Sequence, residues 1–65
     1  MEIRLNGEER QTESSTLQEF LSELGFEGKR VAVELNKEIV PREMYKQVRL
    51  SAGDCLEVVH FVGGG

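Results

Sequence analysis

A single short amphipathic helix constrains this chain more than any other feature of its sequence. Apolar residues spaced i, i+3, i+4 and i+7 make one continuous face, formed by Leu17, Phe20, Leu21 and Leu24. Thr16 and Glu19 have the spacing of a capping box, and Gly25 can take the left-handed conformation that ends a helix. The sequence shows no second pattern of this kind, so we expect the helix to bury its apolar face against a β-sheet.

The residues before the helix predict a β-hairpin. Residues 1–5 alternate between apolar and polar side chains, which is the period of a half-buried strand. The pair Asn6-Gly7 then favours a tight turn, because both central residues of such a turn need positive φ. Residues 8–13 are polar and are expected to return as a short strand with one face in water.

The residues after the helix predict three further strands. A loop at 26–30 leads to strands at 31–35 and 38–40, and Pro41 ends the second because it cannot donate to a ladder. Residues 42–47 are expected to be irregular or to form one helical turn. The expected core positions after Pro41 are Met44, Tyr45, Val48 and Leu50. A turn at 51–54 precedes the last strand, expected at 55–62.

This order of elements predicts an α+β fold of the β-grasp (ubiquitin-like) type. We expect a mixed sheet of four or five strands, with the helix on one face and the first and last strands as parallel neighbours. Residues 1–62 would form one domain, and residues 63–65 a flexible C-terminal glycine tail. A chain of 65 residues buries only about 60% of its unfolded surface. Such a thin core leaves no room for a large internal active site, which argues against an enzyme.

The glycine tail, Gly63-Gly64-Gly65, indicates a function outside the core. Glycine has no Cβ, so such a segment can thread a channel too narrow for side chains and present its carboxylate there. A flexible terminus without a role is the alternative, because many chain ends are disordered.

Charge and composition exclude several classes of partner. The net charge of −4 disfavours nucleic acid, whose affinity comes largely from cations on phosphates, and suits a partner with a basic surface. No stretch approaches the roughly 20 apolar residues of a membrane span. Cys55 is the only cysteine, so the chain cannot form an internal disulfide, which fits the reducing cytoplasm.

Cys55 and His60 are the residues most easily imagined as a nucleophile and its base. They lie five positions apart on one predicted strand, which places them on opposite faces and roughly 16 Å apart. We therefore predict no catalytic residue. We expect Cys55 to be buried or half-buried and His60 to lie at the surface. One cysteine and one histidine are also too few for a structural zinc site, so no metal site is expected.

Val59 and Phe61 are expected to point away from the helix if Leu56 and Val58 point toward it. An apolar pair beside the tail would suit the docking of a partner. The alternative is a register shifted by one residue, which would exchange the two faces. The predicted partner-binding residues are Val59, Phe61, Val62, Gly63 and Gly64.

The chain resembles the ubiquitin-like sulfur carriers in its order of elements, its small size and its C-terminal Gly64-Gly65. Within that group it is similar to the thiamine sulfur carriers of the ThiS family. In those carriers an Asn followed closely by Val-Pro-Arg after the third strand is typical, as in Asn36 to Arg42 here. Gly53-Asp54 before the last strand also matches. The molybdopterin carriers of the MoaD family share the fold and tail, but they are usually longer and have a proline-containing segment before Gly-Gly.

The resemblance implies a carrier mechanism in which the protein is a co-substrate of its partner enzymes and binds no cofactor itself. An adenylating enzyme like ThiF would consume ATP to activate the carboxylate of Gly65. A sulfur donor, usually a persulfide made by a cysteine desulfurase, would then convert it to a thiocarboxylate. Thiazole synthase (ThiG) would take that sulfur. Three alternatives stay open, which are a molybdopterin carrier, a ubiquitin-like protein modifier and an interaction domain with an idle tail.

Overall fold

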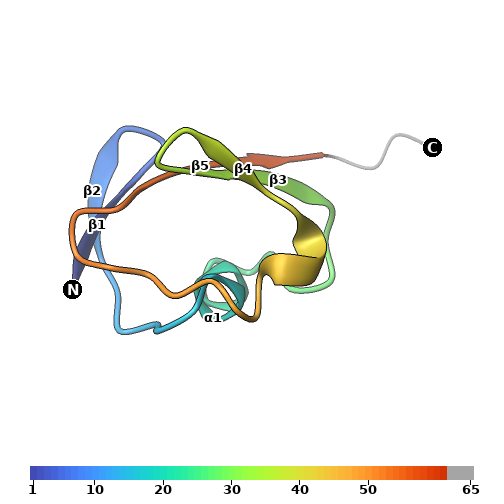
Figure 1. The fold of residues 1–65 in the computed structure, drawn as a ribbon, viewed down its shortest axis with the longest axis horizontal. Coiled ribbons are helices and arrows are strands. Elements are labelled where there is room, and N and C mark those ends of the chain that lie inside the picture. The colour runs from blue at the N-terminus through green and yellow to red at the C-terminus, as the bar shows by residue number, and fades with distance from the viewer. Residues whose placement is uncertain (62–65) are drawn as a thin grey trace.

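The computed structural model describes residues 1–61, and these residues form a five-stranded sheet with one α-helix on one side (Figure 1). The elements are β1 (Glu2–Leu5), β2 (Glu8–Gln11), α1 (Leu17–Glu23), β3 (Val31–Leu35), β4 (Glu38–Val40), the 3₁₀ turn η1 (Arg42–Met44) and β5 (Cys55–His60). This confirms the predicted α+β, β-grasp arrangement. Within the described part of the chain, no helix has the length and apolar character needed to cross a membrane.

Strand β5 occupies the centre of the sheet, whose order is β2-β1-β5-β3-β4. It runs parallel to β1, with Arg4 opposite Cys55 and Leu5 opposite Leu56. It runs antiparallel to β3, from the pair Leu35 and Leu56 to the pair Val31 and His60. The predicted parallel pairing of the first and last strands is therefore confirmed.

Two asparagines in hairpin turns hold β5 in place with their side chains. Asn6 and Asn36 both have φ of 50°, in the left-handed region that asparagine tolerates. The Asn6 amide accepts from the Val58 N–H at 2.9 Å and donates to the Val58 carbonyl at 3.2 Å. The Asn6 side chain thereby makes the hydrogen bonds to β5 that a further residue of β1 would make if that strand continued. In the same way, the Asn36 Oδ1 accepts from the Cys55 N–H at 2.9 Å.

The N-terminus of α1 is closed both by its own residues and by the segment that precedes β5. Thr16 and Glu19 form the predicted capping box. The first two helical N–H groups, those of Leu17 and Gln18, donate to the carbonyls of Val48 and Tyr45 at 2.9 and 3.0 Å. The N–H groups that open every helix are thus satisfied here, and the hydrogen bonds fix the helix to the long connection between η1 and β5.

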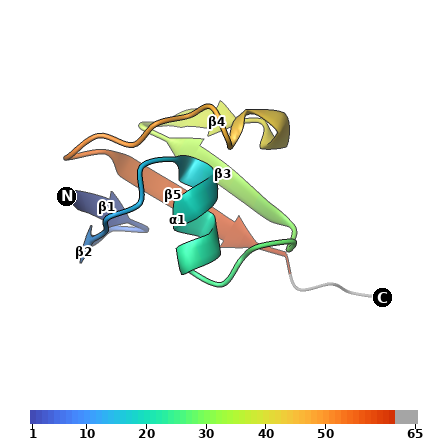
Figure 2. The same ribbon diagram turned by 90° about the horizontal axis from the view of Figure 1, so that it is seen from below.

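The core lies between α1 and the sheet, as Figure 2 shows with the helix in front of the strands. The most deeply buried side chains come from both layers and are Phe20, Ile3, Leu17, Leu56 and Val33. Tyr45, Leu50 and Val58 are also buried, and Val48 packs against this cluster. The sequence pattern predicts that each of these residues lies in the core.

Two expectations about details of the fold are wrong. The last strand ends at His60, before Phe61, which makes only one N–H bond to the carbonyl of Arg30 ahead of β3. The strand was predicted to run to residue 62, which lies outside the described residues. Met44 is 43% exposed and does not cover the core. The tight turn η1 directs only its neighbour Tyr45 into the core. One side chain therefore covers the part of the core that Met44 and Tyr45 were expected to cover together.

Leu21→Ala should destabilise the protein by about 2–5 kcal/mol, the usual cost of truncating a buried leucine. Leu21 is only 3% exposed and lies at the centre of the helical stripe. A loss of this size approaches the whole stability of a small domain. Chemical denaturation followed by circular dichroism measures it. An unchanged denaturation midpoint would contradict the packing described here.

Candidate functional site

The two faces of the sheet differ because α1 covers only one of them (Figures 1 and 2). Leu56 and Val58 of β5 face the helix and are buried. Their neighbours Glu57 and Val59 alternate onto the opposite, outer face and are exposed. On β3, Val33 faces the helix, so Ala32 and Glu34 lie on the outer face with Val59 and Glu57 as their direct partners.

An apolar patch, formed by Ala32, Ile39, Val59 and Phe61, lies on the outer face where β5 ends. Ala32 pairs directly with Val59 across β3 and β5. Ile39 on β4 is 78% exposed, Val59 is 56% exposed and Phe61 is 54% exposed. Exposed apolar side chains gathered at one place make this the surface on which the predicted docking would occur.

A shallow groove of about 330 Å³ crosses this face and gives the patch a polar margin. Ala32, Ile39 and Val59 line its apolar part, and Glu34 and Glu57 line the part nearer the middle of the sheet. These two carboxylates are direct cross-strand partners, an arrangement of like charges that weakens a sheet. A basic side chain on a docked protein would relieve this repulsion.

The pairing of Val59 with Ala32 confirms that Val59 points outward, as the predicted register required, and Phe61 is exposed. The structure adds Ile39, which the sequence reasoning left out of the site. The alternation of β4 could have identified it, because Val40 pairs with the buried Val33 and Ile39 must then face outward. The other predicted site residues, Val62, Gly63, Gly64 and Gly65, lie outside the described residues, as does the boundary predicted after residue 62.

Cys55 and His60 lie at opposite ends of β5 and form no pair. Cys55 is exposed, and the prediction that it is buried or half-buried is wrong. It opens the strand on the outer face, where no helix or loop covers it. His60 is exposed as expected, and its ring contacts Phe26 with a centroid distance of 5.1 Å. Among residues 1–61, no group of three or more potential metal ligands is present.

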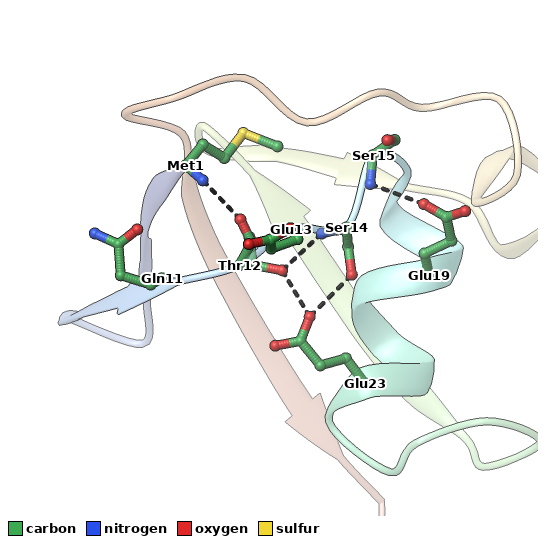
Figure 3. Close-up of a pocket in the computed structure, with 8 residues that line it drawn as sticks. All are labelled: Met1, Gln11, Thr12, Glu13, Ser14, Ser15, Glu19 and Glu23. Atoms are coloured by element: carbon green, nitrogen blue, oxygen red, sulfur yellow. Dashed lines mark hydrogen bonds between the residues drawn. The ribbon is translucent and has the colours of Figure 1, made fainter.

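A second pocket, of about 650 Å³, lies beside the N-terminus and is acidic (Figure 3). The hydroxyls of Thr12 and Ser14 donate to Glu23 Oε1 at 2.6 and 2.9 Å, and the Met1 ammonium donates to the Thr12 carbonyl at 2.7 Å. These groups satisfy one another and fasten the segment between β2 and α1 to the helix. We assign this pocket a structural role.

The hydrogen bonds from Thr12 and Ser14 hold the pKa of Glu23 below its usual value. A lowered pKa in the folded state stabilises the protein above the unfolded pKa, and this contribution disappears as the pH falls through the folded pKa. Glu23→Gln should therefore lower the free energy of unfolding at neutral pH and have a smaller effect in acid, as the pH falls through the lowered pKa of Glu23. Urea denaturation across this pH range measures the difference. In a Thr12→Val background, the effect of Glu23→Gln should depend less on pH. An effect of Glu23→Gln that is equal at every pH would exclude a contribution from these hydrogen bonds to the pKa of Glu23.

Comparison with known proteins agrees with this geometry. Residues 3–65 match the model of the ThiS family. The sulfur carrier protein ThiS of Bacillus subtilis is 43% identical over 65 residues, which cover 97% of this chain and 98% of that protein. A thiazole synthase of Paramagnetospirillum magneticum is 50% identical over 66 residues, and this chain spans only 20% of its length.

A solved structure resembles the fold over its whole length. The crystal structure of the thiamine biosynthesis protein (ThiS) from Geobacter metallireducens superimposes with a TM-score of 0.83 at 32% sequence identity, covering 100% of both chains. The match to the family model spans the residues of the sheet, the helix and the glycine tail of this chain. On these grounds, this chain belongs to the ThiS family.

Proposed function

We propose that this protein carries sulfur for the formation of the thiazole of thiamine. Membership of the ThiS family over residues 3–65 is the observation that carries the proposal. The Gly65 carboxylate is the group that we propose is modified. The proposed partners are an adenylating enzyme like ThiF, a sulfur donor such as a cysteine desulfurase, and thiazole synthase. All of this chemistry suits the cytoplasm, which is the proposed compartment.

The proposed chemistry takes place on the carboxylate and needs no side chain of the carrier. Attack of the carboxylate on ATP gives an acyl-adenylate and releases pyrophosphate, which turns a poor electrophile into a good one. The terminal sulfur of a donor persulfide then displaces AMP and forms an acyl disulfide. A second thiol reduces that S–S bond and releases the Gly65 thiocarboxylate. The role of the folded domain is to bring this group into the active sites of other proteins.

The described residues support this role through the position at which β5 ends. As the central strand, β5 is held by hydrogen bonds from both neighbours, and Phe61 is still bonded to the Arg30 carbonyl at 3.0 Å. Gly65 lies four positions after Phe61, and a fully extended segment of that length spans roughly 13 Å. A partner that covers the apolar patch would therefore hold its reaction centre within roughly 13 Å of Phe61.

The alternatives are less well supported. A molybdopterin carrier of the MoaD family would share the fold, but the family model and the full-length relative are those of ThiS. A ubiquitin-like modifier would use the same tail to form an isopeptide. Intact mass separates a sulfur carrier from a protein modifier, because exchange of one oxygen for sulfur gives a small, definite increase and conjugation gives adducts of high mass.

Phe61→Ala should raise the KM for this chain in ATP–pyrophosphate exchange by about tenfold, because an aromatic side chain in a covered patch contributes strongly to binding. The thermal midpoint should barely change, since Phe61 is half exposed. Met44→Ala is the matched control, being an exposed apolar residue outside the patch. A large loss of thermal stability without a separate loss of affinity would instead place Phe61 in the core.

Removal of Gly65 from a chain that ends there should abolish pyrophosphate release, although a carboxylate would remain on Gly64. The shortened tail would miss the reaction centre by roughly 3.3 Å, and attack needs placement within a fraction of that distance. Gly64→Val should block entry by the bulk of its side chain. Circular dichroism should show an intact fold for both variants. Adenylation of the shortened chain at the normal rate would refute the mechanism.

A further inference from the structure

A small basic pocket lies beside the end of β5, next to the apolar patch. Its volume is about 200 Å³, and it is lined by Lys29, Arg30, Val31, Arg42, Tyr45 and Phe61. Three of these six residues are cations and none is acidic. The pocket joins the groove of the outer face, since Val31, Arg42 and Tyr45 line both.

This cluster of positive charge stands out because the protein as a whole is acidic. The chain carries 8 lysines and arginines against 12 acidic residues, yet three of the cations meet in this one pocket. The ion pair found within residues 1–61 joins Arg4 to Glu9, so none of the three pocket cations is paired in that part of the chain. The fold therefore concentrates unpaired positive charge at the place where the tail begins.

The backbone holds the three cations in position from two separate segments. Lys29 donates its N–H to the Phe26 carbonyl at 2.9 Å, and the Arg30 carbonyl accepts from Phe61. Arg42 begins η1 directly after Pro41, and its carbonyl accepts from the Tyr45 N–H at 3.1 Å. Tyr45 is only 7% exposed, so its ring forms a fixed wall of the pocket. The backbone positions of the three cations are therefore fixed by the fold, and their exposed side chains extend from these positions into solvent.

Two kinds of anion could fill such a pocket, and the length of the tail decides between them. A nucleotide phosphate would have to lie at the Gly65 carboxylate during adenylation. An extended tail places that carboxylate roughly 13 Å from Phe61, too far for these cations to reach the phosphates. Carboxylates on the rim of the enzyme's channel, where the tail enters, would lie beside Phe61 and within reach of these cations. The acidic remainder of the chain would repel such a rim, so the pocket would also orient docking.

We propose that the pocket formed by Lys29, Arg30 and Arg42 binds acidic side chains at the channel entrance of the adenylating enzyme. The proposal rests on the proposed function and specifies how the carrier is recognised. Guanidinium groups bind carboxylates through paired hydrogen bonds, and the two arginines suit that role. The adjoining patch would contribute apolar contact area, and the pocket would contribute orientation and rate of association.

The test compares two triple variants that change the net charge equally. One is Lys29→Gln/Arg30→Gln/Arg42→Gln in the pocket. The other is Arg4→Gln/Arg10→Gln/Lys37→Gln, in the β1–β2 hairpin and the β3–β4 turn, at residues that do not line the pocket. The β1–β2 hairpin lies at the opposite end of the molecule from η1 (Figure 1). The assay is ATP–pyrophosphate exchange with a ThiF-like enzyme at several salt concentrations, giving separate KM values for the carrier and for ATP.

The pocket variant should raise the KM for the carrier about tenfold or more and leave kcat near its normal value. The KM of the unmodified chain should rise with salt, and that of the pocket variant should depend on salt much less. The hairpin variant should change the KM at most about threefold, through the change in net charge alone. The single variant Arg42→Lys keeps the charge but not the paired guanidinium hydrogen bonds, so it should recover only part of the affinity that Arg42→Gln loses.

Three results would overturn the inference. The first is an equal rise in KM for both triple variants, which would show a general effect of net charge. The second is no change for the pocket variant. The third is a raised KM for ATP, which would make the nucleotide the occupant. An unmodified chain that is not adenylated at all would instead contradict the proposed function, so the two failures are distinguishable.

Discussion

The pairing of β5 between β1 and β3 is the interaction on which the rest of the structure depends. Its parallel ladder with β1 and antiparallel ladder with β3 join the two hairpins, which would otherwise be separate. The amide side chains of Asn6 and Asn36 extend these ladders where the neighbouring strands turn away. A strand fixed on both sides is a firm base from which a short tail can reach into another protein.

The same strand serves the core and the surface through its alternation. Leu56 and Val58 close the hydrophobic core under α1, and Val59 one residue later belongs to the apolar patch. A shift of one residue in the register would exchange these roles and would cost both burial and recognition. The sheet can leave its outer face open because one helix suffices to bury the other face in so small a protein.

The surface around the end of β5 divides into regions of different chemistry. The apolar patch offers contact area, the paired carboxylates Glu34 and Glu57 mark its inner margin, and the basic pocket with Arg42 lies at the other side. Such a pattern defines one orientation for a partner, because a rotated complex would oppose like charges. Specificity of this kind would suit the proposed function, in which one chain end is presented to several enzymes in turn.

Local features of this fold were readable from the sequence, because they depend on residues only a few positions apart. The capping box of Thr16 and Glu19, the helical stripe and the Asn6-Gly7 turn are of this kind, and the order of elements followed from them. Residues far apart in the chain were placed by tertiary structure alone. Strand pairing turned Ile39 outward and left Cys55 uncovered, and η1 directed Tyr45 but not Met44 into the core. The basic pocket is the clearest case, since Lys29, Arg42 and Phe61 meet only when the sheet has closed around β5.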